Sequence, residues 1–422
     1  MLVRALYTLL LTLAAPLLLF GLYKSKPNKP KFGQRWKEHF GRTPALNCSK
    51  RPIWIHAVSV GESIAATPLI KALKQQYPDQ PILVTTTTST GAEQIAKLGD
   101  LVEHRYMPID FAFAVRGFLK VINPSKMLII ETELWPNTLN VVNKANVPIY
   151  VVNARLSEKS CNNYAKVQSL FNVIEPCLTK VLCQSASDAA RFECLGVAKE
   201  KLTVTGSIKF DIQISDEVRE KGKKLRAKLG AHRPVWIAAS THQGEDEQVL
   251  AAHEQVLASH PNAILILVPR HPERFDAMFE LSQQLGFDTV RRTAQLDIAD
   301  STQVYLADSM GEMLLLLSAA DICFMGGSLI GDKVGGHNVL EPAALSIPVL
   351  SGPSFYNFKE IINDMKQNSL IEIIENDEEL AKAIIALIDN QVTREHLTAK
   401  LAAFMSANSG SLQRTTIAIM SA

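Results

Sequence analysis

Glu62 is the carboxylate whose place in this sequence is best suited to acid–base chemistry. It stands between a short apolar run, residues 53–55, and a segment, residues 64–77, with apolar residues at helical spacing. Gly61 and Glu62 are therefore expected at a turn from a strand into a helix, where open α/β sheets bind ligands. Such a carboxylate is either a catalytic base or a solvated residue stabilised by the helix dipole, and position alone favours the second.

A second candidate site is a glycine-rich stretch late in the chain. It follows the apolar run 322–325 and contains Gly326-Gly327-Ser328 and Gly335-Gly336-His337-Asn338, which lead into residues 339–342. Glycines let backbone N–H groups approach a phosphate, and a helix that starts after them adds a favourable field. Glu341 could accept the hydroxyls of a ribose. A tight turn before an early helix proline would give the same pattern, so both interpretations stay open.

Other chemistries find no support in the sequence. Neither half has G-x-G-x-x-G after its first apolar run or G-x-x-x-x-G-K-[ST], which argues against a nicotinamide enzyme and a P-loop ATPase. There is no D-x-D motif for metal-assisted sugar transfer. The six cysteines form no C-x-x-C pair and have no His partner at metal spacing. We therefore expect reduced thiols in a cytosolic compartment, with no metal site and no cofactor.

The elements that must position these residues form two series of apolar runs separated by helical patterns. The runs are residues 53–58, 82–87, 127–130, 149–152, 181–184 and 202–205, then 235–239, 264–268, 304–307, 322–325 and 349–350. This alternation is typical of βαβ units with helices on both faces of a parallel sheet. The sequence predicts an α/β protein with two Rossmann-like domains, residues 24–206 and 207–422, joined near 206–214. The last helix could pack back on the first domain.

The N-terminal residues 1–23 are predicted to form a membrane anchor. Residues 5–23 are almost entirely apolar, which is about the length of a membrane helix. No small-x-small cleavage site follows, and lysines stand at 24, 26, 29 and 31, which favours an anchor over a cleaved signal peptide. Positive charge after the run predicts that the domains stay on the cytoplasmic side of an inner membrane. Pro16 leaves open a helix that lies in the membrane surface.

Residues 24–42 form a basic segment. It carries seven Lys and Arg residues, and Phe32, Trp36 and Phe40 recur at i, i+4 and i+8, so a helix here would have an aromatic face. Two interpretations stay open: an anchor for anionic inner-membrane lipids, or a docking surface for an anionic lipid substrate. The net charge of +2 is too small to indicate nucleic acid binding.

Six motifs in this order resemble those of the lipid A Kdo transferase family, the 3-deoxy-D-manno-octulosonic acid (Kdo) transferases. They are residues 56–62 (HAVSVGE), 131–136 (ETELWP), 153–157 (NARLS), 204–211 (VTGSIKFD), 269–275 (PRHPERF) and 335–341 (GGHNVLE). The resemblance covers nearly the whole chain, including the N-terminal anchor. It implies the GT-B fold, in which two Rossmann-like domains face a cleft. Residues 330–334 depart from the family's compact loop between the two glycine clusters.

The resemblance implies transfer of Kdo from CMP-Kdo to a lipid A precursor, lipid IVA, with inversion and without a metal ion. In the family the glutamate that ends the S-V-G-E motif is the proposed general base, which here is Glu62. An inverting transfer needs one base to take the acceptor's proton, so the resemblance reverses the first estimate for Glu62. Pro68, too deep in the helical pattern for a first-position proline, indicates a kink or a helix that begins after Glu62.

The resemblance also implies a CMP site in the second domain. Its residues are Pro269, Arg270, His271, Met310, Gly311, Glu312, Asn338, Val339, Leu340 and Glu341. Arg270 would pair with phosphate or cytosine, and backbone amides of Gly311 and Glu312 would lie at the start of an apolar helix.

Three further residues are candidate contacts to the acceptor or to Kdo: Ser59, Glu133 and Lys209. We expect Glu133 to organise hydroxyl groups and its neighbour Glu131 to be structural, while Lys209 would meet the Kdo carboxylate. Residues 240–242 are weaker candidates for donor contact.

Two alternatives remain beside the Kdo transferase. One is a membrane-associated GT-B transferase that uses a UDP-sugar and another lipid; the other is a scaffold without catalytic activity. The sequence predicts neither the number of sugars added nor an oligomeric state.

Overall fold

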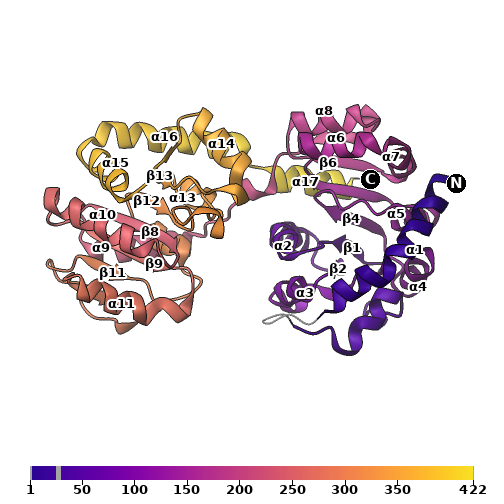
Figure 1. The fold of residues 1–422 in the computed structure, drawn as a ribbon, viewed down its shortest axis with the longest axis horizontal. Coiled ribbons are helices and arrows are strands. Elements are labelled where there is room, and N and C mark those ends of the chain that lie inside the picture. The colour runs from indigo at the N-terminus through magenta and orange to yellow at the C-terminus, as the bar shows by residue number, and fades with distance from the viewer. Residues whose placement is uncertain (1, 25–29, 422) are drawn as a thin grey trace. The chain divides into compact units, whose positions relative to one another are not determined.

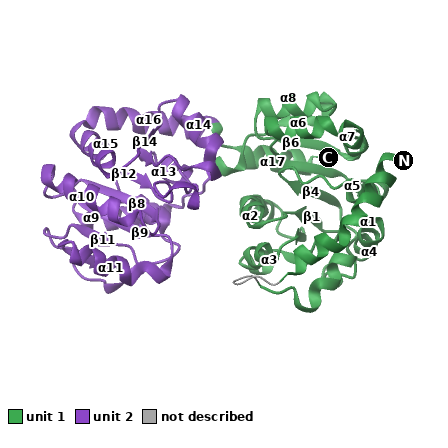
Figure 2. Ribbon diagram, viewed as in Figure 1, with its two compact units in different colours: residues 1–211, 408–422 green, residues 212–407 purple. Residues whose placement is uncertain are grey.

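The structure, a computed structural model, describes residues 2–24 and 30–421 of the chain. Lys26 and Lys29 of the predicted basic segment lie outside the described residues. The chain forms two compact units, Met1–Asp211 with Asn408–Ala422, and Ile212–Ala407 (Figure 2). The units thus divide a few residues after the predicted boundary at 206. The last helix, α17 (Ser411–Met420), is part of the first unit because the Asp211 carboxylate accepts the N–H groups of Gly410 and Leu412 at 2.6 Å each.

The first unit is built on a parallel seven-stranded sheet of order β3-β2-β1-β4-β5-β6-β7 (Figure 1). Its strands are β1 (Ile53–His56), β2 (Ile82–Thr86), β3 (Glu103–Tyr106), β4 (Lys126–Ile130), β5 (Ile149–Ala154), β6 (Lys180–Cys183) and β7 (Leu202–Val204). One face carries α2 (Val60–Gln76), α3 (Ser89–Ala96) and α17; the other carries α4 (Ala112–Ile122), α5 (Pro136–Lys144), α7 (Gln168–Ile174) and α8 (Ala186–Cys194), with α6 (Glu158–Lys166) against α7 and α8. All six apolar runs predicted in this half are confirmed as strands.

Side chains of the central strand enter two separate cores in alternation. Ile53 and Ile55 of β1 pack under α2, whereas Trp54 packs on the opposite face against Phe118 of α4, with ring centroids 4.7 Å apart. All are buried, because helices cover both faces of a parallel sheet. The strand is therefore apolar at every position that the helices cover, which made it visible in the sequence.

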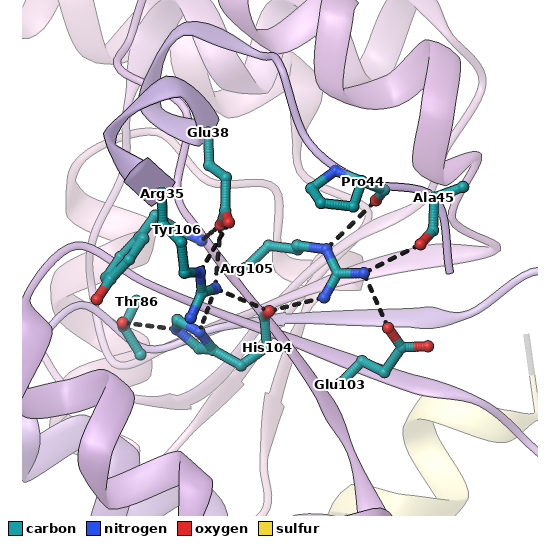
Figure 3. A network of polar contacts seen from close by, with 9 residues as sticks. All are labelled: Arg35, Glu38, Pro44, Ala45, Thr86, Glu103, His104, Arg105 and Tyr106. Atoms are coloured by element: carbon teal, nitrogen blue, oxygen red, sulfur yellow. Dashed lines mark hydrogen bonds and ion pairs between the residues drawn. The ribbon is translucent and has the colours of Figure 1, made fainter. Parts of the chain in front are cut away.

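Strand β3 was not predicted from the sequence, because its residues are polar and do not form an apolar run. It is an edge strand, and side chains supply hydrogen bonds that a neighbouring strand would otherwise make (Figure 3). Glu38 accepts the N–H of Tyr106 at 2.6 Å, and Arg35 donates to the carbonyl of His104 at 3.0 Å. These bonds tie β3 to the 3₁₀ helix η1 (Gly33–Phe40) of the basic segment.

The aromatic residues of the basic segment do not share one face, which corrects the prediction. Phe32 packs against His39 and Tyr106, with ring centroids 5.0 and 4.9 Å apart, whereas Trp36 pairs with Phe40 at 5.7 Å. The predicted face assumed an α-helix. Phe32 instead precedes the 3₁₀ helix, at its N-cap, and its ring packs on β3 and His39 apart from the Trp36–Phe40 pair.

The second unit holds another parallel seven-stranded sheet, of order β10-β11-β9-β8-β12-β13-β14. Its strands are β8 (Val235–Thr241), β9 (Ile264–Pro269), β10 (Thr289–Arg291), β11 (Val304–Leu306), β12 (Ile322–Met325), β13 (Val349–Ser351) and β14 (Ile371–Ile373). The helices are α9 (Asp216–Leu229), α10 (Asp246–Ser259), α11 (Phe275–Gln284), α12 (Met313–Leu317), α13 (Leu340–Ala344), α14 (Lys359–Gln367), α15 (Asp377–Asp389) and α16 (Gln391–Asn408). The strands missed from sequence, β10 and β14, are both short edge strands.

The N-terminal helix α1 (Leu2–Tyr23) rests on the first unit with one face only. Thr8 and Asn137 hydrogen bond through their side chains at 3.0 Å, and Tyr23 bonds His39 Nδ1 at 2.8 Å. Tyr7 hydrogen bonds the buried carboxylate of Asp110. The other face is exposed and consists mainly of leucines. Among the described residues α1 is the helix that is long and apolar enough to cross a membrane.

Candidate active site

Glu62 lies in the first turn of α2, directly after the central strand β1. Strand β1 pairs with β2 on one side and β4 on the other, so its carboxyl end is the switch point of the sheet, where ligands bind in this fold class. Helix α2 begins at Val60, with Ser59 as its N-cap, and continues through Pro68. The predicted strand-to-helix turn is confirmed, and the alternative in which the helix begins after Glu62 is wrong.

The surroundings of Glu62 favour its protonated form more than water does. Burial raises the pKa of Glu62 to about 7, and the negative charges of Glu133 and Glu131 act in the same direction. The N–H of Val58 donates to Oε2 of Glu62, which opposes the rise. A carboxylate with a pKa near 7 is matched to taking a proton from a hydroxyl group at neutral pH.

Glu131 and Glu133 follow β4, the strand next to β1. Both are half-buried, and burial, with the charge of Glu131, raises the pKa of Glu133. Glu131 has a φ of +62°, which is uncommon for a residue other than glycine, so the chain turns sharply at the end of β4. The turn brings the charges of both glutamates to bear on Glu62.

Ser59 and Lys209, the other predicted contacts in this unit, are placed around α2. The carbonyl of Ser59 accepts both the N–H and the hydroxyl of Ser63, at 2.9 and 2.8 Å. Lys209 lies in the 3₁₀ turn η5 (Ile208–Phe210), which contacts α2. Lys209 is half-buried, and no carboxylate within the described parts of the chain lies at ion-pair distance from its ammonium group.

In the second unit the predicted CMP residues lie at or after the carboxyl ends of three inner strands of the sheet. Pro269, Arg270 and His271 come at the end of β9, residues 310–312 follow β11, and residues 338–341 follow β12. The charges of Arg270 and Glu341 interact, and Asn338 Nδ2 donates to Glu341 at 3.2 Å. Val339 and Leu340 are buried and attach this segment to the core. Arg270 is exposed, and no described carboxylate lies within ion-pair distance of it.

The carboxylate of Glu312 is already paired with an arginine of the same unit. Arg292 donates to both of its oxygens at 2.6 Å and holds the pKa of Glu312 at about 2. Beside it, Met310 is exposed, and Gly311, with a φ of +81°, faces open space where a Cβ would stand. This segment therefore has an open backbone at Gly311 and an exposed methionine but no free carboxylate.

The first glycine cluster after β12, residues 326–328, does not offer its N–H groups to a phosphate, so of the two open interpretations it fits the tight turn. The N–H groups of Gly327, Ser328 and Leu329 donate to the carboxylate of Glu245 at 2.7, 3.0 and 3.0 Å. Glu245 is fully buried and comes from the loop between β8 and α10. A carboxylate of the protein thus accepts the N–H groups that a phosphate could otherwise have bound.

Two histidines lie beside Arg270 that the predicted site did not include: His242, only a weaker candidate, and His337. Their Nε2 atoms are 2.8 Å apart, and the ring of His271 stands 5.2 Å from that of His242. His337 belongs to the GGHNVLE motif, which was the one signal available. The roles of Glu245 and Arg292 could not be predicted from local patterns, since their partners are distant in sequence.

Comparison with known proteins identifies both units. A family model described as 3-deoxy-D-manno-octulosonic-acid transferase (kdotransferase) matches residues 34–212, and one described as glycosyl transferases group 1 matches residues 239–402. The 3-deoxy-D-manno-octulosonic acid transferase of Haemophilus influenzae is 40% identical over 414 residues, 97% of this chain and 96% of the relative. That of Bordetella pertussis is 34% identical over 86% of each chain.

One solved structure agrees in fold over most of both chains. The UDP-GlcNAc 2-epimerase of Neisseria meningitidis covers 87% of this chain and 98% of its own, with a TM-score of 0.56 and 11% identity, which supports the GT-B-like architecture alone. The C-terminal CMP-Kdo binding domain of WaaA from Acinetobacter baumannii is 37% identical and covers 44% of this chain and 97% of its own, with a TM-score of 0.43. The chain therefore belongs to the 3-deoxy-D-manno-octulosonic acid transferase family of glycosyltransferases with the GT-B fold.

Proposed function

We propose that this Kdo transferase takes Kdo from CMP-Kdo and places it on a lipid A precursor with inversion and without a metal ion, and that Glu62 is the general base. The acceptor oxygen bonds to the anomeric carbon, its proton passes to Glu62, and the bond from that carbon to the phosphate oxygen breaks. The observation that carries the proposal is a carboxylate with a pKa of about 7 at the switch point of the first sheet.

The positively charged side chains around Arg270 support an anionic donor. Arg270 lies beside His242 and His337, and no carboxylate of the described residues lies within ion-pair distance of its guanidinium, so it can pair with a phosphate. CMP is expected to raise the unfolding temperature of the protein more than UDP does. The reverse order would favour a UDP-sugar as the donor.

Mass spectrometry of the product tests the reaction directly. The purified full chain is incubated with CMP-Kdo and a tetraacylated lipid A precursor, and the lipid is weighed. A gain of one Kdo residue or a multiple of it is expected, and its size counts the sugars. An unchanged lipid mass, with both substrates shown to be intact, would contradict the proposal.

We expect transfer to depend on pH through Glu62. The base acts in its deprotonated form, so the rate should rise with pH up to about 7 and level off above it. In Glu133→Gln a neighbouring negative charge is removed, which should move the midpoint to lower pH. The pH profile of kcat/KM measures both. Glu193→Gln, an exposed glutamate of the same unit, is the matched control, and an unmoved midpoint in Glu133→Gln would contradict the electrostatic coupling.

Helix α1 supports membrane attachment at the inner-membrane surface. Its docked face holds the polar residues Tyr7 and Thr8 against buried partners of the first unit, while Leu13 and Leu17 on the opposite face are 72% and 76% exposed. An exposed leucine stripe on a helix fixed to a domain fits burial in one lipid leaflet, with the domains on the cytoplasmic side.

Binding to lipid vesicles tests this arrangement. Leu13→Glu with Leu17→Glu should weaken binding to vesicles of zwitterionic and anionic lipid by at least about 100-fold, since burying two leucines is worth about 3–6 kcal/mol. Tyr7→Phe with Thr8→Val, on the docked face, should bind as the wild type does. Flotation of the full chain with vesicles gives both numbers, and equal losses in the two variants would refute the assignment of faces.

A further inference from the structure

Three histidines of the second unit gather where strands β8, β9 and β12 end. His242 and His337 hydrogen bond through their Nε2 atoms at 2.8 Å, and their ring centroids are 5.1 Å apart with planes 9° from parallel, so the rings meet edge to edge. The ring of His271 stands edge-on to His242 at 5.2 Å. Imidazoles from three separate loops thus meet beside Arg270.

The fold holds His242 and His337 together. Glu245 accepts the N–H of His242 at 3.2 Å as well as three N–H groups of the glycine cluster, so one buried carboxylate joins the two loops that carry the pair. Gly327 provides the space for the second ring. A Cβ there would lie 2.9 Å from His337, and the φ of +69° is one that glycine adopts freely.

The distance between the two rings limits how many protons can lie between them. A hydrogen bond between two Nε2 atoms needs one N–H group and one lone pair, so the pair shares a single proton there. Two protonated imidazoles would point N–H groups at each other. Burial, with the neighbouring cations, lowers the pKa of His242 and of His337 to about 4. Without a ligand the pair is therefore neutral at neutral pH.

The charges that face the pair are mainly positive. Arg270 and His271 act on both imidazoles, and Arg274 acts on His242. The nearby carboxylates already have partners: Glu245 binds backbone N–H groups, Asp246 pairs with Arg274, Glu273 lies 3.9 Å from His271, and Glu341 accepts from Asn338. An anion bound beside Arg270 would offset this positive charge and raise the pKa of the pair.

The geometry points to the His242–His337 pair, with Arg270, as the binding site of the donor phosphate. It also points to the uptake of one proton by this pair as the sugar leaves. This inference rests on CMP-Kdo as the donor. When the bond between the anomeric carbon and the phosphate oxygen breaks, the electron pair stays on the oxygen, and the phosphate passes from one negative charge to two. The Nε2–H turns to the phosphate, and the lone pair left on the other Nε2 takes a proton from solvent. The resulting positive charge stabilises the leaving group.

The test compares CMP affinity over pH in the wild type and in His337→Gln and His242→Gln. Glutamine places an amide near the Nε2 position but takes up no proton, and titration of CMP itself is common to all proteins compared. Because a phosphate raises the pKa of the pair from about 4 by about 1–3 units, the affinity of the wild type relative to either variant should rise as pH falls from about 6.5 to 5, by up to tenfold per unit. Calorimetry on the full chain in detergent measures it.

Controls separate this inference from the donor assignment. His232→Gln, an exposed histidine of the same unit, should keep the wild-type pH dependence, and cytidine, which lacks the phosphate, should show none. If CMP binds and the ratio of affinities stays constant with pH, the histidine pair is not the binding site of the phosphate. If the wild type fails to bind CMP at every pH, the proposed donor fails, and this inference fails with it.

Discussion

Replacing Glu62 with glutamine is expected to lower the rate of Kdo transfer by about 10²–10⁴-fold while leaving CMP affinity unchanged. The glutamine amide has nearly the same shape and can still accept the N–H of Val58, but it cannot take the acceptor's proton. The predicted CMP residues belong to the second unit and Glu62 to the first, so donor binding should not change. Initial rates at saturating substrates and calorimetry with CMP measure the two effects.

Stability separates a lost base from a damaged fold. The pKa of Glu62 is raised in the folded protein, so the folded state binds more protons than the unfolded state, and stability contributed by this group falls as pH rises through about 4.5–7. At pH 8 Glu62→Gln removes a charge that the fold disfavours, and its unfolding temperature should match or exceed that of the wild type. Transfer at the wild-type rate would remove Glu62 as the base; Glu193→Gln controls for loss of a surface charge.

Replacing Glu245 with alanine is expected to destabilise the second unit by at least about 3 kcal/mol. The carboxylate is fully buried and accepts four backbone N–H groups, and each buried donor left without an acceptor costs about 1–3 kcal/mol. For a unit of this size, such a loss lowers the unfolding temperature by about 6–12 °C. Calorimetric scanning measures it in the transition that CMP shifts.

The matched control for Glu245 is its neighbour on α10. Glu247→Ala removes an exposed glutamate and should change stability by no more than about 0.5 kcal/mol. Glu245→Ala should also weaken CMP binding, because the loops that carry His242 and His337 are no longer joined. A variant as stable as Glu247→Ala would show that water replaces the carboxylate, and the glycine cluster would then be free for a ligand.

The sheets could be predicted because their central strands are covered on both faces. Each of the runs through β1, β4 or β9 is apolar at nearly every position, and the alternation with helical patterns then leaves one fold class. Strands β3, β10 and β14 could not be predicted. They lie at sheet edges, where side chains such as Glu38 complete the hydrogen bonding and polar residues are tolerated.

The sequence by itself determined the two-domain α/β class, the family and the place of Glu62, because these depend on local patterns and on motifs that are continuous in the chain. Only the tertiary structure decided which charges act together. Glu62 takes its pKa from burial and from glutamates about 70 residues away, and His337 meets His242 across 95 residues. The carboxylate of Glu245 already accepts the N–H groups of Gly327 and Ser328 in the first glycine cluster. Such contacts follow from where parallel strands end, and no local pattern records them.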